Sequence, residues 1–394
     1  AGCSLIMSKP PRGFEQSEFE ARTERAQQLM RADEIDAMLL TTEAHVRYFS
    51  GFLTQFWQSP TRPWFLLIPL TGKPIAVIPT IGVAGMQQSW IDDIRSWSSP
   101  QPQDDGISLL LSTIAELPRR FGRLGMTLGK ESYLRMPARD YRHLETELTD
   151  LELVDCAELM LELCSKKSTA EVEKIRYVCE LASDSFNALP GFASLGQSER
   201  EILCSMRKDL LDRGADHTPY IVSASGQDGY GDIIMGPTDR ILEDGDIMII
   251  DTGTVFDGYF CDFDRNYAFG HVSDKTCRAY ETVFRSTDAG FAAARPGATT
   301  TDVWQAMWSI LEAGGARGND VGRMGHGLGS QLTEWPSLTA NDHTPLEAGM
   351  VITLEPGMEF EPGKLMVHEE NILITESGAE MLSKRAAAEL PVII

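Results

Sequence analysis

The stretch DTGTVFDGYFCDFDR, residues 251–265, decides how the C-terminal half of this chain is interpreted. Two β-rich runs flank Asp257-Gly258, a dipeptide that is typical of the two-residue turn of a β-hairpin. Facing residues of an antiparallel pair have a constant sum of residue numbers. A loop at this dipeptide therefore pairs Asp251 with Asp264, and a loop one residue earlier pairs Asp251 with Asp262.

The three aspartates share one face of the hairpin in either register, because side chains alternate along a strand with a period of two. Apolar neighbours such as Ile250 and Phe263 indicate that this face is buried. At ~4 Å and an effective dielectric constant of ~20, each pair of like charges costs about 4 kcal/mol. The carboxylates must therefore be protonated, face water or hold a cation. This segment alone leaves a solvated acidic strand open.

Further candidate ligands stand in glycine-rich or strand-like motifs downstream. Carboxylates combined with one imidazole suit ions such as Mn²⁺, Fe²⁺, Co²⁺ or Zn²⁺. The motifs together predict a site for a pair of divalent ions. They are RMGHGLGSQ (323–331) with His326, VITLEPG (351–357) with Glu355, and LMVHEENILIT (365–375) with Glu369 and Glu370.

The order of these motifs resembles the pita-bread metallopeptidase superfamily, which includes methionine aminopeptidase, aminopeptidase P, prolidase and creatinase. RAQQLMRADEIDAMLLTTEAHVRYFSGF (25–52) is similar to the start of the N-terminal domain of creatinase and prolidase. The resemblance implies an α+β protein, with a creatinase-like α/β domain over residues 1–160. A pita-bread metal-binding domain, an αββ pseudo-repeat, then follows over residues 161–394.

By this resemblance, Glu370 is a neighbouring acid that does not bind metal. The implied cofactor is a pair of divalent transition-metal ions, with iron preferred and manganese, zinc and cobalt as alternatives. The implied metal ligands are Asp251, Asp262, His326, Glu355 and Glu369.

The chain departs from the peptidase pattern at positions where the peptidases carry histidines that contact substrate and move protons. Gly322 and Thr333 stand at two of these positions, and YGDIIMG (230–236) lacks the third histidine. Asp264 replaces a threonine beside the second ligand, and Val367 replaces an arginine. Since near-neutral histidine is the usual proton carrier, these changes predict a different reaction.

GHGLGSQLTEWPS (325–337) resembles the dimethylsulfoniopropionate lyases of this superfamily. We therefore expect β-elimination that yields dimethyl sulfide and acrylate, with the ions acting as Lewis acids on the carboxylate of a zwitterionic substrate. Asp264 is the first candidate base, and a further metal ligand is its alternative role. Glu334 is the second candidate base, with a surface glutamate as the alternative.

Aromatic side chains should hold the sulfonium group of such a substrate by cation–π attraction. Trp335 lies beside Glu334 and close to His326 in the sequence. Trp57 lies where the N-terminal domain of related dimers reaches a partner's active site. Packing in the core or at a dimer interface is the alternative for each tryptophan.

Three other functions remain open. An Xaa-Pro dipeptidase or aminopeptidase would release products that contain proline and would need proton-carrying histidines. A creatinase-like C–N hydrolase of a small molecule would need a general base near the scissile bond. A binding module without activity would have lost its metal ligands.

Bulk properties exclude several classes of partner. A net charge of −23 opposes binding to nucleic acid, which depends on Lys and Arg. Apolar runs such as WFLLIPL (64–70) are too short to span a membrane. AGCSLIM (1–7) lacks the basic and long apolar regions of a secretory signal, and seven scattered cysteines suit reduced thiols. Reduced thiols suit a cytoplasmic protein, and the resemblance to pita-bread enzymes with this N-terminal domain implies a homodimer.

Periodicity predicts the order of the elements. A capping box of Ser168 and Glu171 should start a long helix, and the change of pattern near 150–165 marks the domain boundary. The predicted helices cover 21–35, 165–192, about 198–213 and a pair within about 275–315, and the predicted strands cover 36–42, 63–70, 73–79, 218–270 and 349–375.

Overall fold

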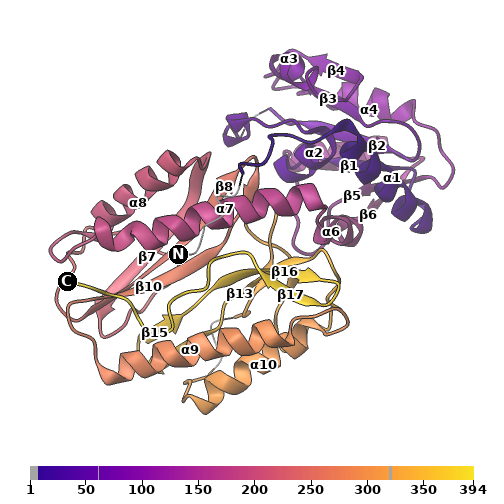
Figure 1. Ribbon diagram of the computed structural model, residues 1–394. Helices are drawn as coiled ribbons and strands as arrows, with labels where there is room; N and C mark the ends of the chain where they lie inside the picture. The colour runs from indigo at the N-terminus through magenta and orange to yellow at the C-terminus, as the bar shows by residue number, and fades with distance from the viewer. Residues whose placement is uncertain (1–7, 61, 319–321) are drawn as a thin grey trace. The chain divides into compact units, whose positions relative to one another are not determined.

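A computed structural model describes residues 8–60, 62–318 and 322–394. The chain forms two compact units (Figure 1). The N-terminal unit is Pro11–Cys164, and the C-terminal unit is Ser165–Ile394 together with residues 8–10. The segment AGCSLIM (1–7), with the prediction made for it, lies outside the described residues.

The N-terminal unit is an α/β domain built on one mixed sheet with the strand order β4-β3-β2-β1-β5-β6. Successive residues of β1 point to opposite faces, and both faces are buried: Met38 and Leu40 enter one core, and Ala37 and Leu39 enter the other. A sheet that is covered on both sides needs apolar residues at every position, which explains the unbroken run AMLL.

The strands of this unit are β1 (Ala37–Leu40), β2 (Phe65–Pro69), β3 (Ile75–Pro79), β4 (Asp93–Trp97), β5 (Arg123–Met126) and β6 (Glu152–Asp155). Its helices are α1 (Gln16–Ala32), α2 (Glu43–Ser50), α3 (Val83–Met86), α4 (Ile107–Ala115), α5 (Ala138–Glu147) and α6 (Ala157–Ser165). Short 3-10 turns are η1 (Gln55–Gln58) and η2 (Thr80–Gly82).

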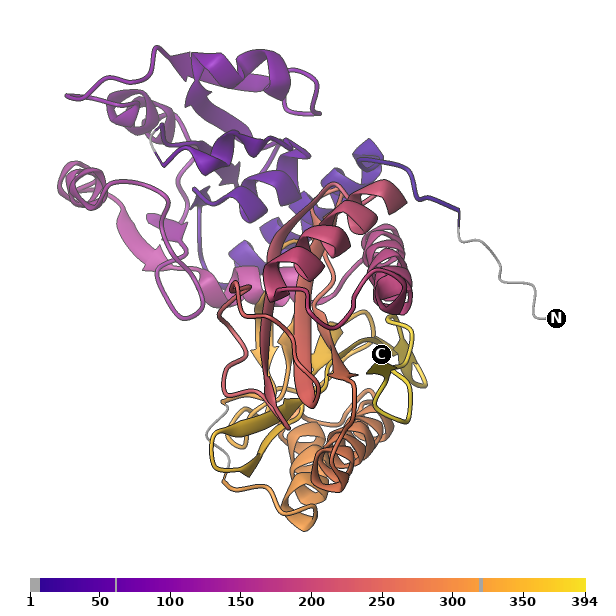
Figure 2. The same cartoon turned by 90° about the vertical axis from the view of Figure 1, so that its left-hand side faces the viewer.

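The C-terminal unit places two sheets and a two-stranded ribbon between pairs of helices. Helices α7 and α8 cover the sheet of β7, β8 and β10, and α9 and α10 lie on the other side of the strands (Figures 1 and 2). This is the pita-bread arrangement, so the predicted fold class is confirmed. Among the helices of the described residues, none combines the length and apolar character needed to cross a membrane.

The helices of this unit are α7 (Thr169–Ala188), α8 (Glu199–Arg213), α9 (Asp274–Ala293) and α10 (Thr300–Ala313), with the 3-10 turn η3 (Leu189–Gly191). One sheet contains β7 (His217–Gln227), β8 (Asp246–Phe256), β9 (Tyr259–Phe260), β10 (Phe263–Phe269) and β18 (Val392–Ile393). The other contains β11 (His326–Gly327), β12 (Glu334–Ser337), β13 (Val351–Leu354), β16 (Glu370–Thr375) and β17 (Gly378–Met381), and β14 (Gly357–Glu361) pairs with β15 (Lys364–Val367).

Helix α7 begins as the sequence predicts. The Ser168 side chain accepts a hydrogen bond from the Glu171 backbone N–H at 3.2 Å, and the Glu171 side chain accepts one from the Ser168 N–H at 2.8 Å. This reciprocal capping box satisfies two backbone donors that the first helical turn leaves unpaired.

The β8–β10 hairpin adopts the first of the two predicted registers. Asp251 faces Asp264, and Phe256 faces Tyr259 across the turn. Asp257 and Gly258 both have positive φ angles, 50° and 82°, as a tight hairpin turn requires. The register puts Asp251, Asp262 and Asp264 on one face.

The predicted strand over 365–375 is interrupted. Strand β15 ends at Val367 and pairs with β14, whereas β16 begins at Glu370 and pairs with β13. Glu369 lies at this change of partner. The strand signal extended over both pieces because both are apolar, and it carried no information about the switch between sheets.

Candidate metal centre

Five potential ligands from separate parts of the C-terminal unit line one cavity of about 390 Å³. They stand within strands or directly beside strand ends, where backbone pairing fixes the direction of each side chain. These residues are Asp251 in β8, Asp262 between β9 and β10, His326 in β11, Glu355 after β13 and Glu369 between β15 and β16.

The tightest group combines Asp262, His326 and Glu369, whose potential ligand atoms all lie within 4.8 Å of one another. The Nε2 atom of His326 lies 3.3 Å from Asp262 Oδ2 and 3.9 Å from Glu355 Oε1. All three members of the group are buried. Their atoms converge from segments that are more than 40 residues apart in the sequence.

His326 is held in the form that a metal ligand requires. Its Nδ1 atom lies 2.8 Å from the backbone oxygen of Gly327, which can only accept a hydrogen bond. Nδ1 therefore carries the proton, and the lone pair on Nε2 faces the carboxylates. The His326 N–H donates to Thr353 Oγ1 at 3.0 Å, which fixes the backbone of the same residue. Such outer contacts orient metal-binding histidines.

The carboxylates of the cavity are poorly compensated by protein charge. Burial raises the pKa of Asp251 well above its ordinary value, and the nearby charges of Asp262 and Glu355 raise it further. Burial likewise raises the pKa of Asp262, Asp264, Glu355 and Glu369. A cation bound among them would reverse this effect by favouring the charged forms.

Unsatisfied oxygen atoms point to the same conclusion. Asp251 Oδ1, Asp264 Oδ1 and Glu369 Oε1 are buried and have no hydrogen-bond partner among the described residues. Buried carboxylate oxygens are normally paired with donors or bind metal. The donor set, which consists of hard oxygens with one imidazole, fits divalent ions of the kind predicted.

Asp264 lies in this cavity wall and is 2% exposed. It faces Asp251 across the hairpin. Burial raises its pKa most strongly, the charge of Asp251 adds to this rise, and the adjacent Arg265 opposes it. The structure thus places Asp264 among the metal-ligand candidates, on the face that the sequence predicts.

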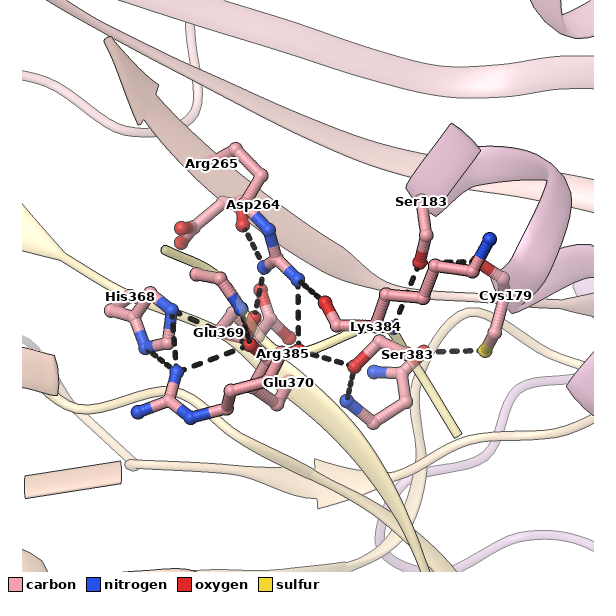
Figure 3. A network of polar contacts seen from close by, with 12 residues as sticks. Cys179, Ser183, Asp264, Arg265, His368, Glu369, Glu370, Ser383, Lys384 and Arg385 are labelled. Carbon is pink, nitrogen blue, oxygen red and sulfur yellow. Dashed lines mark hydrogen bonds and ion pairs between the residues drawn. The ribbon is translucent and has the colours of Figure 1, made fainter. Parts of the chain in front are cut away.

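Glu370 belongs to a different environment from Glu369, as Figure 3 shows. Arg265 Nη2 donates to Glu370 Oε2 at 2.9 Å, and Arg385 Nη1 donates to Oε1 at 3.2 Å. The Ser383 hydroxyl donates to Oε2 as well. Both oxygens are therefore engaged by protein donors, in keeping with a residue that does not bind metal.

Asn371 joins the hairpin to β16 and so holds the two halves of the centre together. The Asp262 backbone N–H donates to Asn371 Oδ1 at 2.9 Å, and the Asn371 amide donates back to the Asp262 backbone oxygen. Cys179 of α7 lies 3.3 Å from the same Oδ1 atom. This two-way bond fixes the position of Asp262 relative to the strand that follows Glu369.

Glu334 and Trp335 are not among the described residues that line the cavity. The Lys167 ammonium donates to Glu334 Oε2 at 2.8 Å, and both side chains are almost fully buried. Trp335 is half-buried and packs against the core of the C-terminal unit. The proton-transfer role of Glu334 and the substrate contact of Trp335 stay predictions.

Trp57 lies in the core of the N-terminal unit. The ring centroid of Trp57 is 5.7 Å from that of Trp64. The guanidinium carbon of Arg135 lies 4.9 Å from the Trp57 centroid. Only 7% of its surface is exposed. Within its own unit the side chain is a packing residue, and its predicted contact with substrate stays a prediction.

Several cavity residues were not assigned a role from the sequence. Tyr220 of β7 lines the cavity with Asp251, and the pKa of Tyr220 is raised by burial and by the charges of Asp251 and Asp262. Arg323 lies three residues before His326, within the same quoted motif. The pairing of β7 with β8 could have located Tyr220, but the sequence offered no signal for that pairing. An apolar wall is formed by Ile233, Ile234, Ile249, Leu332 and Val367.

The fold and this centre define the class of a pita-bread metalloenzyme. Residues 173–376 match Metallopeptidase family M24, and residues 22–163 match the Creatinase/Prolidase N-terminal domain. The chain belongs to metallopeptidase family M24, a family that binds divalent metals.

Relatives with similar sequences carry peptidase names. The chain is 29% identical over 356 residues to an uncharacterized peptidase, YqhT, of Bacillus subtilis. The aligned residues cover 87% of this chain and 92% of that protein. It is 24% identical over 368 residues to the Xaa-Pro dipeptidase of Pyrococcus furiosus, with 93% and 98% covered.

Solved structures agree with the fold. The crystal structure of dipeptidase PepE from Mycobacterium ulcerans matches with a TM-score of 0.83 and 25% identity, covering 97% of this chain and 99% of that one. The prolidase from Pyrococcus horikoshii matches with a TM-score of 0.79 and 24% identity over 93% and 99% of the two chains. At 24% identity, the match to the prolidase structure supports the fold alone.

The prediction of a dimethylsulfoniopropionate lyase is wrong. The relatives and structures reported above are named as peptidases, dipeptidases or prolidases, and the peptidase alternative fits them better. The lyase prediction rested on histidines that are absent at fixed offsets. A missing residue removes one route for a proton, but it does not specify the reaction that replaces it.

Proposed function

We propose that this protein hydrolyses an amide bond in a small substrate, with Xaa-Pro dipeptides as the first class to test. The observation that carries this proposal is the group of buried, uncompensated carboxylates around His326 in a cavity of about 390 Å³. A cavity of this size suits a ligand of a few hundred daltons. The dipeptidase names of the relatives support the same substrate class.

In the proposed centre, divalent ions would be held by Asp251, Asp262, His326, Glu355 and Glu369. Ions bound there would supply Lewis acidity toward a carbonyl oxygen and toward water. The protein's own contribution is a fixed set of donors in a cavity with an apolar wall. The His326 tautomer and the Asn371 bridge fix that set before substrate binds.

We propose Asp264 as the group that carries the proton during hydrolysis, with a further metal ligand as its alternative role. Among the described residues that line the cavity, His326 is the only histidine, so a second imidazole does not take this task. Water attacks the carbonyl carbon and gives a proton to the Asp264 carboxylate. Asp264 then passes the proton to the amide nitrogen as the C–N bond breaks, which leaves a carboxylic acid and an amine.

The direct test is hydrolysis of a dipeptide panel by the full-length protein. After chelation, Mn²⁺, Co²⁺, Zn²⁺ and Fe²⁺ are restored one at a time, and release of free proline from Ala-Pro and Gly-Pro is measured. Pro-Ala and Ala-Ala serve as matched substrates of similar size. We expect metal-dependent release from Xaa-Pro substrates, and no release with any restored ion would refute the proposal.

A second candidate is hydrolysis of a C–N bond in a small molecule that is not a peptide. The observation in its favour is the glycine at 322 and the threonine at 333, where peptidases of the superfamily carry histidines. Adding N-acyl amino acids and ureido or guanidino acids to the same panel separates the two. Faster turnover of those compounds than of Ala-Pro would favour this candidate.

We also propose a cytoplasmic homodimer that uses iron. These points rest on the resemblance to enzymes with a creatinase-like N-terminal domain. Light scattering coupled to size exclusion gives the oligomeric state, and elemental analysis of protein purified without added metal gives the ion. A monomer, or protein that holds only another metal, would contradict them.

A further inference from the structure

Arg323 is the one Lys or Arg among the described residues that line the cavity. Five carboxylates share that lining with it: Asp251, Asp262, Asp264, Glu355 and Glu369. Two divalent ions would offset four of these five negative charges, which leaves the wall slightly negative without Arg323. A substrate that carries its own carboxylate would be repelled by such a wall unless a cation received it.

The guanidinium of Arg323 is held in place but not saturated. Its Nη1 atom donates to Ser337 Oγ at 3.3 Å, and Nη2 donates to Thr333 Oγ1 at 3.4 Å. Nε lies 3.9 Å from Glu355 Oε1, which is beyond hydrogen-bond distance. Arginine has five N–H donors, and these two long bonds to neutral hydroxyls use only two of them. The side chain is 33% exposed, so a ligand can reach it.

The distance between Arg323 and the ligand cluster suits a short substrate. Glu355 belongs to the cluster, and Arg323 Nε lies 3.9 Å from it. A carboxylate bound to Arg323 would therefore lie beside the ligand cluster, so a substrate that joins the two has room for only a short segment, since one residue of extended chain spans roughly 3.5 Å. The apolar side chains of Leu332 and Val367 line the same cavity and can contact the intervening ring or side chain.

We infer that Arg323 binds the terminal carboxylate of the substrate and restricts the site to molecules that end one residue after the scissile amide bond. This inference rests on the proposed amide hydrolysis and names the group that selects its substrates. Arginine suits the task because its planar donors match both oxygens of a carboxylate. Thr333 and Ser337 position the guanidinium.

Binding of L-proline and L-prolinamide tests the inference without turnover. The two probes differ only in the carboxylate, and calorimetry on the manganese-loaded full chain measures both. We expect the wild-type protein to prefer L-proline, and Arg323→Gln to weaken L-proline binding about 10- to 100-fold, since a charge-assisted pair is lost. Binding of L-prolinamide should stay within twofold.

Two further variants make this result specific. Arg323→Lys keeps the charge but loses the planar pair of donors, so it should restore only part of the preference. Arg278→Gln removes the same charge from an exposed position on α9, and it should bind both probes as the wild type does. Metal content and thermal unfolding of each variant verify that the centre and fold are intact.

Kinetics with Ala-Pro and its C-terminal amide give the second readout. Arg323→Gln should raise KM for Ala-Pro and lower its kcat/KM, and it should lower kcat/KM for the amide by a clearly smaller factor. Equal binding of L-proline by Arg323→Gln and wild type, or no preference for the acid in the wild type, overturns the inference.

The same experiments separate this inference from the proposed function. Loss of L-proline binding in Arg323→Gln without cleavage of any dipeptide would retain the carboxylate site and reject the hydrolysis. If wild type and Arg323→Gln both cleave Ala-Pro and show the same preference for acid over amide, the proposed hydrolysis is retained and the carboxylate site at Arg323 is rejected.

Discussion

Glu369 and Glu370 are adjacent and almost completely buried, at 3% and 0% exposure, but their surroundings are opposite. Glu370 accepts hydrogen bonds from Arg265 and Arg385, whereas Glu369 Oε1 has no partner among the described residues. Neighbouring residues of an extended chain point to opposite sides, so one step along the backbone separates the two environments. Burial of an acid therefore does not by itself indicate a metal ligand, and the proposed role of Glu369 rests on the absence of a compensating donor.

The network around Glu370 also shows how protein charge can replace an ion. Arg385 Nη1 donates to Glu370 Oε1 at 3.2 Å and lies 3.1 Å from His368 Nε2. Burial and the nearby arginines lower the pKa of His368 well below its ordinary value, so this imidazole is neutral and can accept from Arg385. The contrast with the cavity yields four predictions.

Removal of divalent ions should have the largest effect. Without them the five carboxylates of the cavity repel one another and no Lewis acid is present, so we expect turnover to fall by more than about 1000-fold. Asp262→Ala and His326→Ala should lose bound metal and turnover together. Elemental analysis and product release measure both. Glu312→Gln, an exposed acid on α10, is the control and should retain both. Full activity in metal-free protein would contradict this prediction.

Substitution of the two neighbouring glutamates should affect the metal-free protein in opposite directions. Glu370→Gln leaves Arg265 and Arg385 without their buried partner and should lower the free energy of unfolding by about 3–5 kcal/mol. Glu369→Gln removes one repelling charge and should leave that free energy unchanged or raise it. Urea unfolding in the presence of a chelator compares them. Equal destabilisation by both substitutions would show that the two environments are not distinct.

The pH dependence of stability should differ between metal-free and metal-loaded protein. The folded-state pKa values of Asp251, Asp262, Asp264, Glu355 and Glu369 lie above the ordinary values of 3.8 and 4.5. Groups with a raised folded-state pKa stabilise the fold fully below the unfolded-state pKa, and this contribution is lost as the pH rises through the folded-state value.

Metal-free protein should therefore become less stable between pH 5 and pH 8, by about 1.4 kcal/mol for each unit by which a pKa is raised. Bound ions should remove this decline. Thermal unfolding across this range, with and without Mn²⁺, measures the difference. The general repulsion of an acidic chain adds to the slope, so Glu369→Gln is the matched comparison and should flatten it. Identical slopes for wild type and Glu369→Gln would contradict the assignment.

Much of the fold could be predicted from local signals. The Asp257-Gly258 dipeptide located the hairpin and left two registers open, and the structure adopts the one in which both turn residues have positive φ angles. The capping box at Ser168 located the start of α7 for a similar reason. Such patterns depend on residues a few positions apart, which a single sequence displays directly.

The parts that could not be predicted depend on contacts between distant segments. Glu334 pairs with Lys167, which lies 167 residues earlier in the chain. Glu369 lies where the chain changes from one sheet to the other, and no local pattern indicates that change. Arg323 stood inside a quoted motif, but its place among five carboxylates emerges only when β8, β11 and β13 are assembled. The lyase hypothesis failed because it depended on absent residues.

Asp264 is intermediate between the two glutamates, and its substitution should have the smallest effect. Like Glu369 it has an unpartnered oxygen, and like Glu370 it lies beside Arg265. If it carries the proton, Asp264→Asn should lower kcat about 10- to 100-fold, which corresponds to about 1.4–2.7 kcal/mol, and keep most of the metal. Parallel loss of metal would instead make Asp264 a ligand. Asp264→Glu is the companion variant, because it keeps the charge and moves the carboxylate by one methylene. Unchanged kcat and metal content in Asp264→Asn would show that Asp264 neither carries the proton nor binds metal. The contrast between a buried acid paired with arginine and a buried acid without a donor would then rest on Glu370 and Glu369 alone.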